Sequence, residues 1–113
     1  MEHKMKLNNE PFMSIKSGNK TIELRLYDEK RSKIKVGDVI EFTNVTNGEV
    51  LYVDVVSLYR YNSFEDLYKD FDKVSLGYDI DEDANYKDME KYYSKSEQSK
   101  YGVVGIEIKI RKI

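Results

Sequence analysis

Strict alternation of apolar and polar residues closes the chain, and this feature constrains the fold more than any other. From Val104 to Ile110 every second residue is valine or isoleucine, and two of the three residues between them are charged. Side chains of a β-strand point alternately to its two faces, so the pattern predicts a strand with one buried face. The segment 20–27 alternates in the same way. We therefore expect half-buried strands near both ends of the chain.

The rest of the sequence predicts two further strands and three helices. Pro11 and Gly18 bound a short helix over 10–16. A turn at 36–38 leads into a strand with Ile40 and Phe42 facing inward, and Thr46-Asn47-Gly48 indicates a hairpin into a long strand over 49–60. Ser63, with Asp66 three residues later, resembles a helix cap. A second helix is expected over 84–93, and polar or charged loops are expected over 28–35, 76–83 and 94–100.

The order of these elements indicates the fold class. Helix, three strands, two helices and strand predict an α+β fold. We expect a small, mostly antiparallel β-barrel with a short N-terminal helix and two helices inserted before the last strand. The 113 residues suit one domain spanning 1–113, which can bury roughly two thirds of its unfolded surface.

Composition argues against several classes of function. The chain has no cysteine, and its one histidine, His3, lies near the N-terminus, where chains are often frayed. We therefore expect no disulfide, no metal site, no cofactor and no histidine-dependent triad. The start of the chain is short and mostly polar, without the apolar core of a signal peptide, and no apolar run is long enough to span a membrane. These features predict a cytoplasmic protein.

Charge is unevenly distributed, although the formal net charge is only −2. Residues 1–37 hold nine lysines and arginines against five acidic residues, whereas residues 61–99 hold five against eleven. Residues 100–113 are again basic, with four against one. If the ends pair in one sheet, the protein has a basic side that can attract phosphates, although a solvated lysine-rich surface is the simpler explanation.

Three segments carry a resemblance to a known family. Residues 17–25, SGNKTIELR, resemble the G-x-K-x-x-E-x-R signature of the ASCH family. Residues 35–40, KVGDVI, resemble the K-x-G-D-x-I turn of that family, and residues 101–108, YGVVGIEI, are similar to its closing strand, Y-G-V-x-x-I-x-I. The resemblance extends from Lys6 to Ile110.

The resemblance implies a PUA-like pseudo-barrel with a cleft beside the covering helices. Members of the family are proposed to bind RNA, which implies RNA or a nucleoside as the partner. A bacterial branch hydrolyses the acetyl amide of N4-acetylcytidine with a lysine that Lys20 matches. This branch has threonine where this chain has Glu23, and it uses a glutamate for which Asp81, Glu82 and Asp83 are candidates here. Binding is thus the primary expectation, with an amidohydrolase that uses Lys20 and Glu23 as the alternative.

The residues of the signature also support this expectation directly. Lys20 lies on the same predicted face as Ile22 and Leu24, so its ammonium is expected at the barrel mouth, where it can act as a base, hold a phosphate or pair with a carboxylate. Glu23 and Arg25 share the opposite, outward face, with Cα atoms roughly 7 Å apart. This pair either forms a salt bridge or contacts a base and a phosphate.

Tyrosine is abundant, with ten residues and no tryptophan. Tyrosine rings can stack on bases, and Tyr92, Tyr93 and Tyr101 are expected near the cleft, although most tyrosines at such spacings pack in or around a core. Tyr93 and Tyr101 join Lys20, Glu23 and Arg25 as the predicted binding residues. The acidic run over 79–83 lacks the spacing of an EF-hand loop, and Asp83 is expected to cap the following helix.

Overall fold

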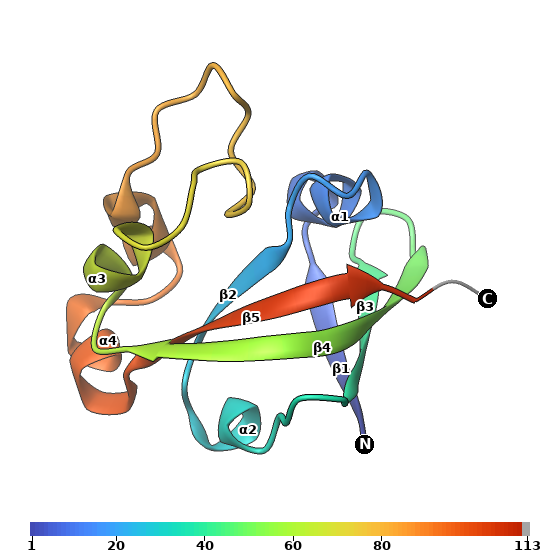
Figure 1. The fold of residues 1–113 in the computed structure, drawn as a ribbon, viewed down its shortest axis with the longest axis horizontal. Helices are drawn as coiled ribbons and strands as arrows, with labels where there is room; N and C mark the ends of the chain where they lie inside the picture. Colours follow the sequence, from blue (N-terminus) through green and yellow to red (C-terminus); the bar gives the residue numbers. More distant parts are fainter. Residues whose placement is uncertain (112–113) are drawn as a thin grey trace.

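A computed structural model describes residues 1–111, whose five strands form one curled sheet (Figure 1). The order across the sheet is β1-β3-β4-β5-β2. The β1–β3 pair is parallel and the other three pairs are antiparallel, as predicted for a mostly antiparallel sheet. The strands are β1 (Glu2–Leu7), β2 (Ile22–Leu26), β3 (Val39–Asn44), β4 (Val50–Tyr61) and β5 (Val103–Ile110).

Curling of the sheet brings its two edge strands, β1 and β2, towards each other. The Arg25 guanidinium of β2 donates a hydrogen bond from Nη2 to the Lys6 carbonyl of β1 at 3.2 Å. A bulge between Val55 and Ser57 interrupts the β4–β5 register, and bulges increase the local twist and bend of a strand. The result is a half-barrel whose open seam lies between β1 and β2.

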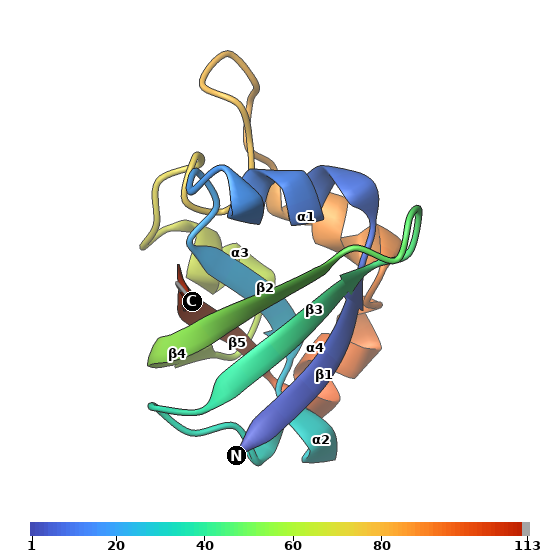
Figure 2. The same cartoon turned by 90° about the vertical axis from the view of Figure 1, so that its right-hand side faces the viewer.

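The helical segments occupy three positions around this half-barrel. In both views α1 lies at one end of the sheet and α2 at the other, while Figure 1 places α3 and α4 on the side away from β1 (Figures 1 and 2). The segments are α1 (Asn9–Lys16), α2 (Glu29–Ser32), α3 (Phe64–Tyr68), the 3-10 helix η1 (Tyr86–Lys91) and α4 (Lys95–Tyr101).

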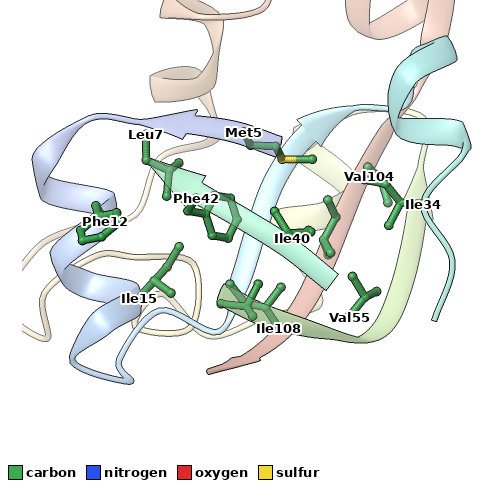
Figure 3. Close-up of a cluster of buried hydrophobic side chains, with 12 residues drawn as sticks. Met5, Leu7, Phe12, Ile15, Ile34, Ile40, Phe42, Val55, Val104 and Ile108 are labelled. Carbon is green, nitrogen blue, oxygen red and sulfur yellow. The ribbon is translucent and has the colours of Figure 1, made fainter. Parts of the chain in front are cut away.

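The main core fills the inside of the half-barrel. Inward residues of β5 meet Phe12 and Ile15 of α1, together with Ile40 and Phe42 of β3 (Figure 3). Phe12, Ile40 and Phe42 have no exposed surface. The inward faces predicted for β3 and β5 are therefore confirmed.

A second core covers the outer face of β2. It joins Ile22, Leu24 and Leu26 to Phe64 and Leu67 of α3. Both faces of β2 are consequently covered, one by the barrel interior and the other by the inserted helices. This double burial determines where the polar side chains of β2 lie.

The structure corrects several predicted elements. Residues 2–7 form β1, and His3, expected to be frayed, bonds through Nε2 to Asp38 Oδ2 at 2.8 Å. The expected loop over 94–100 is mostly helix α4, because Ser94 and Glu97 form a complete capping box. The loop over 28–35 contains the helical turn α2. The predicted helix over 84–93 is the shorter η1, capped by Asn85 instead of Asp83.

Candidate functional site

The inward face of β2 carries charge. In the antiparallel register Glu23 lies opposite Ile106, and Arg25 lies opposite Val104. Residues directly opposite each other in a sheet share a face, and both β5 partners belong to the main core. Glu23 and Arg25 therefore point into the half-barrel. The predicted alternation is correct, but the predicted outward direction of this pair is wrong, because the inserted helices cover the apolar face instead.

Lys20 reaches the same place from outside the strand. Gly18 adopts a positive φ of 87°, and the backbone N–H of Lys20 then bonds to the Ser14 carbonyl at 3.0 Å. Since β2 begins only at Ile22, strand alternation does not direct the Lys20 side chain. Its Nζ lies 3.1 Å from Glu23 Oε1. The predicted position with Ile22 and Leu24 is thus wrong, and Lys20 joins Glu23 and Arg25 in one charged row.

Glu23 is the centre of the charged row and is only 3% exposed. Its Oε1 accepts from the Leu24 N–H at 3.1 Å as well as from Lys20, and its Oε2 accepts from Nη2 of Arg25 at 2.9 Å. Burial acts to raise the pKa of Glu23, but the charges of Lys20 and Arg25 together hold it below its ordinary value. The carboxylate is therefore ionised and its acceptor positions are occupied.

Arg25 connects the charged row to the seam of the half-barrel. Besides Glu23, its guanidinium contacts the Lys6 carbonyl of β1. Burial acts to lower the pKa of Arg25, but the Glu23 carboxylate and the nearby Tyr93 hydroxyl raise it above its ordinary value. The guanidinium is thus a permanent cation with its orientation set on two sides.

A pocket of about 550 Å³ opens over the charged row. We call it the first pocket. Lys6 and Lys91 add two cations to Lys20 and Arg25 in its lining, and three carboxylates accompany Glu23. These three carboxylates belong to Glu10, Glu82 and Asp88. Four formal positive charges thus face four negative charges, which is a polar but electrically balanced wall.

Tyrosines form another part of this wall. Tyr93 stacks on Phe64 with ring centroids 5.8 Å apart, so one of its faces is already occupied. The Tyr78 hydroxyl lies 2.9 Å from the Tyr68 hydroxyl and 2.7 Å from Asp88 Oδ2. Burial, with these partners, raises the pKa of Tyr78. The Tyr78 phenol therefore remains a neutral hydrogen-bonding group, and it holds the Asp88 carboxylate at the pocket.

Comparison with known proteins identifies the family. The sequence profile of the ASCH domain matches residues 5–111. This chain belongs to the ASCH family. No protein with a curated description matches the chain.

Solved structures agree with this assignment. Hypothetical protein PH0355 is 34% identical, with a TM-score of 0.83 over 98% of this chain and 100% of its own. Protein PF0455 from Pyrococcus furiosus is 37% identical, with a TM-score of 0.72 over the full length of both chains. The ASCH protein from Zymomonas mobilis is 14% identical, with a TM-score of 0.67 over 96% of this chain and 66% of its own, which shows the shared fold alone. The predicted PUA-like α+β fold is confirmed.

In this ASCH domain the predicted binding residues fall in two places. Lys20, Glu23, Arg25 and Tyr93 line the first pocket, whereas Tyr101 lines a separate pocket near the N-terminus. Tyr101 lies apart from the other four residues because it ends α4 at the far end of β2, where the Tyr27 N–H bonds to the Gly102 carbonyl.

Several pocket residues had not been predicted from the sequence. Among the acidic candidates of the 79–83 loop, Glu82 lines the first pocket and Asp81 and Asp83 do not. Asp88 was missed together with Tyr68 and Tyr78. For Asp88 the only signal in the sequence is that a carboxylate lies within the tyrosine-rich segment 86–93, and this pattern is equally typical of an amphipathic helix.

Within residues 1–111, no three histidine or carboxylate side chains gather in an arrangement that can hold a metal ion. Over the same residues, no helix combines the length and the apolar character that crossing a membrane requires.

Proposed function

We propose that this ASCH domain binds RNA or a nucleoside by taking one base into the first pocket. The observation that carries the proposal is the balanced charge of the pocket above the buried row Lys20, Glu23 and Arg25. A wall with equal numbers of cations and carboxylates suits a neutral ligand that presents both donors and acceptors. Nucleobases have this character, and their phosphates would remain outside the pocket.

The hydrogen-bonding groups suggest separate roles. Glu23 is fully engaged by Lys20, Arg25 and Leu24, so it orients the two cations and does not itself contact the ligand. Lys20 and Arg25 supply donors to carbonyl or ring-nitrogen acceptors of a base. Asp88 can accept from an exocyclic amine, and Tyr92, which is largely exposed at the rim, offers a ring face for stacking.

A binding titration tests this proposal. The four ribonucleosides and an RNA octamer of mixed sequence are titrated into the protein at low salt, with chemical shifts or heat as the signal. We expect saturable binding that Lys20→Ala weakens at least tenfold. Lys109→Ala removes the same charge from an exposed position on β5 and serves as the control. Absence of binding by every nucleoside and by the octamer would contradict the proposal.

An amidohydrolase acting on an acylated nucleoside is the second candidate. It is supported by the presence of Lys20 and Glu82, an amine and a carboxylate, in the lining of the same pocket. It predicts release of acetate from N4-acetylcytidine, abolished by Lys20→Met. N4-acetylcytidine that stays intact during prolonged incubation with a large amount of protein would eliminate this candidate and leave the binding proposal in place.

A further inference from the structure

The open seam of the half-barrel joins the first pocket to a second one. The second pocket has a volume of about 450 Å³, and its lining includes His3, Lys30, Lys33 and Tyr101. Strand β1 runs from this pocket, at His3, to the first pocket, at Lys6 and the two residues that follow it. Strand β2 runs the opposite way, and the residues that precede and follow it line the first and second pockets respectively.

Both strands are edges of the sheet. They stand at the two ends of the order β1-β3-β4-β5-β2, and Figure 2 shows β1 along the margin of the sheet. Edge strands carry backbone N–H and C=O groups without a neighbouring strand. The Arg25 contact to Lys6 spans the seam at the first pocket. The seam is therefore a polar strip that connects the two pockets.

The charge along this strip differs from that of the first pocket. Lys4, Lys30 and Lys33 lie outside the first pocket and are exposed, and none of them forms an ion pair with another side chain among residues 1–111. Asp28, in the second pocket, is already paired with Arg31 at 3.0 Å. The free cations outnumber the free carboxylates, Glu2 and Glu29, which favours a polyanion along the strip.

Tyr101 adds an aromatic surface at the far end of the strip. Its side chain is 38% exposed, and the Lys100 ammonium lies 5.1 Å from the centre of its ring. A partly exposed tyrosine beside unpaired lysines can stack a base while the lysines contact the neighbouring phosphates. A peptide would use the edge strands but would gain little from this combination of a ring and three unpaired lysines.

We propose that single-stranded RNA lies along β1, with one base in the first pocket and a second contact at Lys30, Lys33 and Tyr101. The proposal rests on the proposed function and deepens it from a nucleoside to an oligonucleotide. Six residues of strand span ~20 Å. This is enough for an RNA segment of about four nucleotides, the short end of the range for small β-barrel domains.

A comparison of ligand lengths and variants tests this path. Affinities are measured for the tightest-binding ribonucleoside, for RNA of two nucleotides and for RNA of six, in the wild type, in Lys30→Ala/Lys33→Ala and in the control Lys95→Ala/Lys109→Ala. Both double variants remove two exposed lysines, but Lys95 and Lys109 line neither pocket. We expect the first variant to lose about five- to tenfold in affinity for the hexamer and to weaken its salt dependence. Its affinity for the nucleoside should not change.

Each result separates this proposal from the proposed function. If the nucleoside binds but the hexamer binds no more tightly than the dinucleotide, the path along β1 is wrong and the first pocket stands. Equal losses in the two double variants would also overturn the path, because they would show an effect of net charge alone. If neither nucleoside nor RNA binds to the wild type, both proposals fail.

Discussion

Both faces of β2 are largely covered, but they differ in chemistry. One face carries the apolar row Ile22, Leu24 and Leu26, which packs against the inserted helices. The other carries Glu23 and Arg25 of the charged row, with Lys20 joining from the preceding turn. A single strand of five residues therefore separates a purely hydrophobic interface from a buried ionic network.

The two faces make different contributions. Burial of the apolar row stabilises the fold by roughly 25 cal/mol for each Å² of apolar surface removed from water. The charged row loses its hydration on burial, and an apolar replacement of similar volume is often neutral or stabilising. Since stability alone does not explain the charged row, its position beneath the first pocket supports a role in binding.

Replacement of Glu23 by glutamine should have the largest effect on stability. It leaves the buried Lys20 and Arg25 without a counter-charge, which we expect to cost about 3–5 kcal/mol in the free energy of unfolding. Chemical denaturation measures this loss. Glu41→Gln, which alters an exposed carboxylate bonded to Tyr52, should change stability by less than about 1 kcal/mol. Similar effects of the two substitutions would show that the charged row is not coupled as described.

Truncation of the apolar row should destabilise the protein without altering the pocket. Leu26→Ala removes a side chain that lies in the second core and does not line the first pocket. We expect a loss of about 2–5 kcal/mol, with ligand affinity unchanged at temperatures where the variant is folded. Val50→Ala, at an exposed position, should change stability by under about 0.5 kcal/mol. Loss of affinity in folded Leu26→Ala would show that the two faces are not independent.

Acid should lower the free energy of unfolding through the charged row, by less than the two substitutions do. The pKa of Glu23 is lowered from its ordinary value of 4.5, so its contribution is fully present above that pH and is lost as the pH falls through the lower folded-state value. The contribution of Asp38 to stability is also lost in acid, because its bond with His3 lowers its pKa from 3.8 to about 2.

Stability curves below pH 5 can separate the two carboxylates. A variant with apolar side chains in place of the charged row retains the Asp38 contribution and lacks that of Glu23. Its free energy of unfolding should therefore fall less steeply with acid than that of the wild type. Identical slopes would contradict the lowered pKa of Glu23.

Much of the fold could be predicted because its signals are local. The alternation of β5, the hairpin at Gly48 and the Ser63 cap each depend on a few neighbouring residues. Strand β1 was missed because it offers only Met5 and Leu7 as buried residues and pairs with a strand more than thirty residues away. Helix α4 was missed because it has no apolar stripe and buries only Gln98, although its capping box is visible in the sequence.

The candidate site was predictable in its residues but not in its arrangement. Periodicity correctly placed Glu23 and Arg25 on one face of β2, but it cannot indicate which face meets the barrel when helices cover the other. It also does not apply to Lys20, which lies before the strand, beside Gly77. A Cβ on Gly77 would come within 3.0 Å of Lys20 Cδ, so the lysine position depends on a glycine 57 residues away. Such contacts are tertiary and leave no local pattern.

The account is tested most directly by replacing the charged row as a unit. In Lys20→Met/Glu23→Leu/Arg25→Met, apolar side chains of similar size occupy the same space. We measure the free energy of unfolding and the affinity for nucleosides and RNA on the same preparation. We predict stability equal to or greater than that of the wild type, together with complete loss of binding. A folded variant that binds as the wild type does, or one destabilised by several kcal/mol, would contradict the claim that the charged row is retained for ligand binding and not for stability.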